Sequence, residues 1–474
     1  MKWEYIGTGL ALIGIGVTLI LALPPPWLPK MSAQLVQVGV IGGVVLLLVG
    51  ACLLILGVIP ALPSGKMGPV FLISLGIVSA IAGAIWYAVP DSAPDDGQLV
   101  ARLAELGWTV KPSPDEIQFE LTGYDILNGR PLPPMEESAT YFAQLKKPFT
   151  LLLQGVSGLN GLHYLADIGG CKKIAIAAVE FTDISELQGF GHLTSLTISQ
   201  MPASRPGVVD PSVLSSLTNL TELNLPMTRI RTLDFAASLK KLRVLNVGQT
   251  SVGDLSPLSK IEELEKLDVR DTRVTDLSPL ANNPNLRELM ISGAQISSLA
   301  SLTSLNNLKT VSIIEQTPID LTAVGQLKKL ETLSIWGPLV LDIRPIGNLS
   351  NLRSLQISGF GLGPTTVAQN MQVIGNLKEL RTLALGQLQL TSIDFVQSLT
   401  SLTELSLAQL LISSLAPVRG LPSLSKVALT DIRVADISPL LSLPRLSELT
   451  LIRIPARGDI VAQLERNSVA VRMY

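Results

Sequence analysis

The 474-residue sequence has few of the side chains on which most enzymes and metal sites depend. It contains two cysteines, Cys52 and Cys171, and two histidines, His163 and His192. Two cysteines cannot form a disulfide framework, and the common zinc sites need about four Cys, His or carboxylate ligands at suitable spacing. Neither histidine is accompanied by a motif that supplies a nucleophile or an orienting carboxylate. We therefore predict that the protein is not an enzyme, and we expect no metal and no cofactor.

Clustered positive charge is also missing. The 36 Lys and Arg residues are balanced by 38 Asp and Glu residues, which gives a formal net charge of −2. Nucleic-acid-binding proteins usually carry a basic patch or stripe, and no run of basic residues of that kind occurs here. The glycine-rich segment 359–363 lacks the Lys-Ser/Thr ending of a phosphate-binding loop. The sequence therefore predicts neither a nucleic-acid partner nor a nucleotide site.

Charged residues are absent from three long apolar runs near the N-terminus. The runs cover residues 5–23, 35–62 and 70–89, and each is about long enough to cross a ~30 Å hydrocarbon core as a helix. We expect residues 1–90 to form an α-helical three-span transmembrane region, which makes this an integral membrane protein with the lipid bilayer as a partner. A cleaved signal peptide in place of the first span stays an alternative, because the chain begins Met-Lys.

The apolar runs contain no ionisable residue, which argues against transport, proton relay or ion conduction. They do contain small residues at four-residue spacing, such as Gly39 with Gly43 and Gly76 with Ala80. Small residues at this spacing allow two helices to pack closely. Such packing fits a hairpin within one chain, and it also fits a homo-oligomer.

The sidedness of the membrane region depends on few charges. Lys2 and Lys66 would lie on one side of the bilayer, whereas Lys30 and the acidic segment 91–96 would lie on the other. The positive-inside rule then places the N-terminus in the cytoplasm and, after three crossings, the rest of the chain on the non-cytoplasmic side of the cell membrane. Since the difference is only about one or two charges, the opposite orientation stays open.

The rest of the chain is dominated by one short sequence that repeats. Clear copies read LRVLNVGQTSVGDLSPL and LEKLDVRDTRVTDLSPL. The first apolar residue of the central L-x-L marks each copy at one constant spacing, at Leu223, Leu245, Leu267, Leu289, Val311, Leu333 and Leu355. After one longer step the original spacing resumes, at Leu383, Leu405, Val427 and Leu449. A fixed period of this length indicates a solenoid.

One copy shows why the repeats must stack. Leu245 and Val247 alternate with Asn246 and Gly248, which is the period of a β-strand. A single copy cannot bury its apolar side alone, so we expect the copies to share one core beneath a curved parallel β-sheet. With the degenerate copies from residue 151 onward there are about 13 coils, and at ~4.8 Å per strand the sheet is on the order of 60 Å long. Such a sheet offers a surface rather than a pocket.

Several copies carry a second motif after the strand. The clearest examples are Asp254-Leu-Ser-Pro-Leu258, Asp276-Leu-Ser-Pro-Leu280 and Asp436-Ile-Ser-Pro-Leu440. In these features the chain resembles the 22-residue leucine-rich repeats of internalin-like proteins, over roughly residues 150–455. The resemblance implies an α/β leucine-rich repeat solenoid that uses its concave face for binding.

One position departs from that family. Where the family usually has a buried asparagine in the turn after the strand, this chain has other residues, namely Thr228, Thr250, Thr272, Ala294, Gln316, Pro338 and Phe360. The side-chain ladder that would satisfy the backbone groups of the turns is therefore weakened. We expect the later coils to be less regular.

The segments around the repeats are expected to be a linker and two caps. The expected boundaries are 91–98 for the linker, 98–150 for the N-terminal cap, 151–455 for the repeats and 456–474 for the C-terminal cap. Helices are expected at 98–107, with Asp96 as N-cap, and at 136–146. Val471 falls one repeat period after Leu449, which favours a final strand. An independent ligand-binding domain at 98–150 stays an alternative.

The exposed faces of the strands indicate where a partner would bind. Alternation exposes Asp268 and Arg270 in a part of mixed charge, and Ile314 and Trp336 in a part with small neutral neighbours. An exposed aromatic beside an exposed aliphatic residue is typical of a protein-binding anchor. The alternative for Trp336 is packing on its own turn. We predict these four residues as the partner-binding residues of the concave face.

Together these features predict a membrane-anchored protein–protein interaction protein, for recognition or as a scaffold. It would bind a protein partner, whose identity the sequence does not indicate, on the concave face of its repeats. That use of the face comes from the resemblance, because a solenoid does not dictate its ligand. The alternative is a structural, self-associating membrane protein without a soluble ligand.

Overall fold

A computed structural model describes most of the chain after residue 93. The described residues are 94–113, 115–122, 132–156, 158–178, 183–200, 210–292, 296, 298–314, 320–337, 341–359 and 368–474. The chain divides into two compact units, 1–93 and 94–474. The three predicted membrane spans lie outside the described residues, and among the residues that are described no helix is long and apolar enough to span a membrane.

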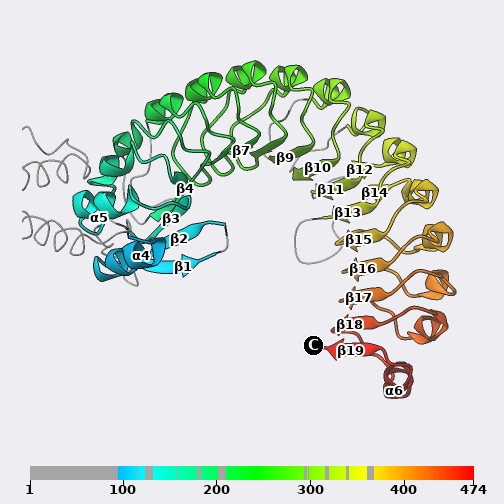
Figure 1. Cartoon of the computed structure of the whole chain (residues 1–474). Coiled ribbons are helices and arrows are strands. Elements are labelled where there is room, and N and C mark those ends of the chain that lie inside the picture. The colour runs from blue at the N-terminus through cyan, green and yellow to red at the C-terminus, as the bar shows by residue number, and fades with distance from the viewer. Residues whose placement is uncertain are drawn as a thin grey trace, which may run out of the picture. The chain divides into compact units, whose positions relative to one another are not determined.

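One sheet of 17 strands organises residues 94–474 (Figure 1). Strand β1 (Thr109–Pro112) is antiparallel to β2 (Ile117–Thr122), and every later neighbour is parallel. The remaining strands are β3 (Phe149–Gln154), β4 (Cys171–Ala178), β5 (Ser195–Gln200), β6 (Glu222–Asn224), β7 (Val244–Asn246), β8 (Lys266–Val269), β9 (Glu288–Ser292), β10 (Thr310–Ile314), β11 (Thr332–Trp336), β13 (Ser354–Ser358), β15 (Thr382–Gly386), β16 (Glu404–Ala408), β17 (Lys426–Thr430), β18 (Glu448–Ile452) and β19 (Ala470–Met473). The predicted parallel sheet of stacked repeats is confirmed.

The strand register follows the repeat period. Leu223 lies opposite Leu245, and Leu245 lies opposite Leu267. The longer step keeps the same register, since Leu355 lies opposite Leu383. Outside this sheet, the same region adds a separate two-stranded pairing of β12 (Leu341–Asp342) with β14 (Ala368–Gln369). The extra residues of the long coil therefore do not disturb the sheet.

Short 3-10 helices complete the coils on the outer, convex side, whereas the strands line the inner, concave side (Figure 1). These helices are η3 (Leu162–Leu165), η4 (Ser185–Leu187), η5 (Ser212–Ser216), η6 (Asp234–Ser238), η7 (Ser256–Lys260), η8 (Ser278–Asn282), η9 (Ala300–Ser304), η10 (Val324–Gln326), η11 (Arg344–Asn348), η12 (Met371–Asn376), η13 (Asp394–Ser398), η14 (Ala416–Val418) and η15 (Ser438–Ser442). The Asp-Leu-Ser-Pro-Leu motif forms the start of such a helix. In one copy, the backbone N–H of Ser256 donates to Asp254 Oδ1 at 2.7 Å, and Pro257 needs no donor in the first turn.

The core runs between these two layers. In β10, Val311 and Ile313 are fully buried, while Thr310, Ser312 and Ile314 are half-buried on the opposite face. Burial of one such aliphatic side chain stabilises the fold by roughly 1.5–3 kcal/mol, and the same pattern recurs in each coil. The solenoid is therefore held together by one continuous apolar core.

In the turns that lack asparagine, other side chains occupy its position. The hydroxyls of Thr228, Thr250 and Thr272 each donate to the backbone carbonyl three residues earlier, at 2.7 to 2.8 Å. In later coils the same position holds buried apolar residues, for example Leu388 and Leu410. The strand register runs without a shift from β13 to β18, whereas the turn residues Ala294, Gln316, Pro338 and Phe360, on which the expectation of less regular coils rests, lie outside the described residues. Apolar side chains at this position add to the core instead.

The N-terminal end of the sheet is covered by two helices, α4 (Asp96–Glu105) and α5 (Met135–Phe142). The N-cap of α4 is Asp95, which accepts from Gln98 N at 2.8 Å, and not the expected Asp96. Asp96 instead accepts from the backbone N–H of Lys146 at 2.9 Å, beyond α5. Helix α5 ends at Phe142, earlier than expected, where its aromatic ring stacks on Phe149 of β3.

The C-terminal end is covered by helix α6 (Gly458–Arg466) and by strand β19. Ile460 and Leu464 are the buried residues of α6. Val471 of β19 lies opposite Leu449 of β18, in the register that the repeat spacing predicts. The last coil therefore ends in a strand that extends the same parallel sheet.

Candidate protein-binding surface

Every second residue of each strand points away from the core. The first, third and fifth residues of successive strands therefore form three rows of side chains on the concave face. In the middle of the solenoid one row runs Ser292, Ile314, Trp336 and Ser358, in direct register across β9, β10, β11 and β13. Adjacent strands lie roughly 4.8 Å apart. Ile314 and Trp336 are therefore immediate neighbours, and both are half-buried.

Asp268 and Arg270 bind each other. The guanidinium of Arg270 donates to both carboxylate oxygens of Asp268, with a shortest distance of 2.6 Å, and its backbone N–H donates at 3.1 Å. The Asp268 side chain is only 7% exposed and that of Arg270 is 42% exposed. The hydrogen bond to Asp268 raises the pKa of Arg270, which favours the charged guanidinium. Most of the hydrogen-bonding capacity of Asp268 is used within the chain.

Strand β9 separates the charged pair from the apolar pair. Met290 of β9 lies in register between Asp268 and Ser312, and it is half-buried on the concave face. It therefore extends the apolar surface of Ile314 and Trp336 diagonally toward β8. Sequence reasoning left Met290 out of the predicted site, although strand alternation exposes it in the same way as Ile314. We call Met290, Ile314 and Trp336 the apolar concave patch.

Two pairs of opposite charges lie on the β8 side of the apolar concave patch. Lys266 of β8 lies 2.7 Å from Glu288 of β9, in addition to the Asp268–Arg270 pair. On the other side of the patch, β13 presents Ser354, Gln356 and Ser358, which carry no charge. A partner that covers the patch would therefore meet apolar surface beside charges that already form these two ion pairs.

His163, His192 and Cys171 are each held by a neighbour or buried. His163 Nδ1 lies 2.6 Å from Glu186 Oε2, and His192 Nε2 is buried without a hydrogen-bond partner among the residues described. Burial raises the pKa of the Cys171 thiol, which keeps it protonated and unreactive. Over the described part of the chain, no three His, Cys, Asp or Glu side chains are grouped so that they could hold a metal ion.

The sequence of the region around β8 and β9 matches a known repeat family. Residues 262–304, from before β8 to the end of η9, match two copies of the family model described as leucine-rich repeats. Residues 262–304 therefore have the sequence pattern of leucine-rich repeats. A search of curated proteins gives no significant match.

Solved structures that resemble this solenoid include two bacterial proteins and one animal protein. An internalin of Listeria monocytogenes has 23% sequence identity and a TM-score of 0.53, over 77% of this chain and 92% of that chain. A leucine-rich repeat protein of Leptospira interrogans has 17% identity and a TM-score of 0.50, over 72% and 99%. Drosophila Toll, solved in complex with Spätzle, has 13% identity and a TM-score of 0.52, over 77% and 62%. At these identities the likeness establishes the fold and not the function.

Proposed function

We propose that this protein is a membrane-anchored interaction protein that binds a protein partner on the concave face of its leucine-rich repeats. The observation that carries the proposal is the apolar concave patch of Met290, Ile314 and Trp336, which has two ion pairs on its β8 side. The energetic centres of protein interfaces are aromatic and aliphatic residues in surroundings from which water is excluded. The patch has that composition, and the ion pairs beside it form the kind of rim that such interfaces have.

The fold supports this proposal in a general way. A parallel sheet of many strands presents a long, rigid surface, and rigid surfaces lose little conformational entropy when a partner binds. Toll, a structural neighbour, was solved in complex with the protein Spätzle. This chain has the same solenoid architecture as Toll, which supports a protein as its partner.

The membrane anchor in the proposal comes from the sequence alone. Residues 5–23, 35–62 and 70–89 are uncharged runs of spanning length. A reporter that is active only in the cytoplasm, fused after Tyr474, tests the proposed sidedness together with protease treatment of intact cells. A silent reporter and protease-sensitive repeats are expected for repeats on the non-cytoplasmic side. An active reporter with protected repeats would instead make the protein a cytoplasmic scaffold.

The double variant Ile314→Asp with Trp336→Asp tests the binding surface. We expect capture of the partner by the full chain, measured by cross-linking and quantitative mass spectrometry, to be abolished. The matched control is Thr430→Asp with Ile452→Asp, which introduces the same charges at two register neighbours of β17 and β18. Thermal melting confirms that both variants are folded.

The control variant should capture the partner as well as the unmodified chain does. Undiminished capture by the Ile314 and Trp336 double variant would move the interface to another surface. If the chain then also forms an oligomer that persists after deletion of residues 1–90, the structural, self-associating function replaces the proposal.

A further inference from the structure

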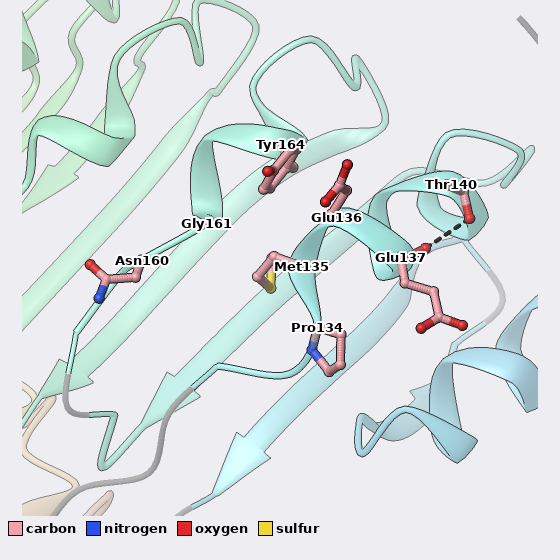
Figure 2. Close-up of a pocket in the computed structure, with 8 residues that line it drawn as sticks. All are labelled: Pro134, Met135, Glu136, Glu137, Thr140, Asn160, Gly161 and Tyr164. Atoms are coloured by element: carbon pink, nitrogen blue, oxygen red, sulfur yellow. Dashed lines mark hydrogen bonds between the residues drawn. The ribbon is translucent and has the colours of Figure 1, made fainter. Parts of the chain in front are cut away.

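A hollow of about 490 Å³ lies between helix α5 and the turn that leads into η3, and none of its lining residues that the structure describes belongs to a strand (Figure 2). It is therefore separate from the concave surface. Its size falls within the range of roughly 300–1,000 Å³ that is common for small-ligand pockets. The proposed function makes no use of it.

Met135 and Gly161 form the floor of this hollow. Met135, the first residue of α5, is 4% exposed. Gly161 has a φ of 85°, and a Cβ atom at this position would lie 3.1 Å from Met135 Cβ. Only glycine combines this backbone conformation with such a close approach. The floor is thus apolar and is set by tight packing of the turn against α5.

Tyr164 forms a wall of the hollow, and its ring is held in place by His163. The Tyr164 ring packs on the ring of His163, with centroids 4.4 Å apart and an angle of 31° between the planes. Glu186 holds His163 in turn, since it accepts from the backbone N–H of His163 at 3.1 Å and lies 2.6 Å from His163 Nδ1. Tyr164 remains 44% exposed. An aromatic ring is therefore presented to the hollow in a fixed orientation.

Two carboxylates complete the hollow. Glu136 and Glu137 occupy the first turn of α5, and Figure 2 shows the Glu136 side chain beside that of Tyr164. Both are exposed, and no Lys, Arg or His among the described residues forms an ion pair with either of them. Their charges also make the N-terminal end of α5 unsuitable for an anion, which a bare helix end would favour. The charge of this hollow therefore selects a cation.

We propose that this hollow binds an organic cation, namely an ammonium or guanidinium group carried on an aliphatic chain. The charged head would lie against the face of Tyr164 and pair with the Glu136 carboxylate, while the aliphatic part would contact Met135. Two sources share this chemistry, a free small amine or guanidine and the basic side chain of a protein or peptide. The proposal is independent of the function assigned to the concave face.

Calorimetric titration of the full chain tests the proposal. The probes are n-butylguanidinium and the peptide acetyl-Gly-Arg-Gly-amide, and the control probe is the same peptide with neutral citrulline in place of arginine. We expect saturable binding of the two cations and none of the citrulline peptide. Glu136→Gln and Tyr164→Leu should each weaken binding by roughly three- to tenfold, because each removes one of two moderate interactions.

Matched variants separate the site from general effects of charge and folding. Tyr164→Phe keeps the ring and should bind nearly as well as the unmodified chain. Glu379→Gln removes an exposed carboxylate in a distant coil and should leave binding unchanged.

Much tighter binding of the arginine peptide than of n-butylguanidinium identifies a protein side chain as the ligand, and equal binding identifies a small cation. Equal binding of the citrulline peptide, insensitivity to both site variants, or no saturation below about 10 mM would overturn the proposal.

Discussion

Asn283 donates a hydrogen bond of 2.7 Å from its side-chain amide to the backbone carbonyl oxygen of Ile261, one coil earlier. A second bond, at 3.0 Å, joins the same amide nitrogen to the carbonyl oxygen of Leu258. Asn283 is fully buried, and the residues at the same place in the coils before and after it, Ile261 and Leu305, are apolar. A polar side chain thus occupies one position in a stack of apolar side chains from successive coils, which we call the apolar ladder.

Replacement of Asn283 by leucine is expected to stabilise the protein. Asn283 Oδ1 is buried and has no hydrogen-bond partner in the described part of the chain, whereas both carbonyls also accept backbone N–H groups. Asn283→Leu removes the unpaired oxygen and fills the apolar ladder, which should raise the free energy of unfolding by about 1 kcal/mol. Urea denaturation measures this change. A loss of more than about 1 kcal/mol would show that the two amide bonds outweigh the unpaired oxygen.

Asn307 belongs to a different ladder, in which exposed asparagines join successive coils. Its amide nitrogen donates to the carbonyl oxygen of Pro284 at 2.9 Å, and its oxygen accepts from Lys329 Nζ at 2.8 Å. Asn307→Ala should therefore lower the free energy of unfolding by about 1 kcal/mol. Asn306→Ala is the control, since the Asn306 amide makes one long bond of 3.4 Å within its own turn. Equal effects of both variants in urea denaturation would refute a role for bonds between coils.

The aspartates that begin the 3-10 helices should make stability depend on acid pH. The hydroxyl and the backbone N–H of the serine two residues later donate to Asp254, Asp276 and Asp436, which lowers the pKa of each carboxyl. A folded-state pKa below the unfolded one gives stability that is present above about pH 4 and is lost as the pH falls through the lowered value.

The triple variant with asparagine at Asp254, Asp276 and Asp436 tests this pH dependence. Asparagine keeps an acceptor oxygen for the backbone N–H but does not titrate. The melting temperature of the variant should therefore change less between about pH 4.5 and 2.5 than that of the unmodified chain. Parallel curves for the two proteins would mean that these carboxyls do not contribute.

His192 should make stability depend on pH near neutrality. Burial, assisted by the positive charge of Lys172, lowers the pKa of His192. The unfolded chain therefore binds a proton at higher pH than the folded chain does, so stability present above about pH 6.5 is lost as the pH falls. His192→Gln should flatten the dependence of melting temperature on pH between about 7 and 5. The same measurement on His163→Gln separates the contribution of the other histidine, and an unchanged slope for His192→Gln would contradict the prediction.

The candidate surface could be predicted only in part from the sequence. Strand alternation was sufficient to place Ile314 and Trp336 on one face, because the strand period and the repeat period fix both the side and the neighbour of each residue. The pairing of Asp268 with Arg270 depends on side-chain conformation, which no periodicity encodes. The Asp95 cap and the early end of α5 were missed because helix ends are decided by local contacts such as that of Asp96 with Lys146.

The sequence by itself determined the solenoid, its strand register and its core. Each repeat carries the same apolar pattern, so Leu245 must lie between Leu223 and Leu267 whatever the rest of the chain does. The tertiary structure alone decided that Asn283 bonds to the carbonyl of Ile261 in the preceding coil, and which side chains form the hollow of Met135 and Tyr164. These contacts are not marked by any repeated residue pattern. They depend on how closely one turn of backbone approaches the next, which only the packed coils define.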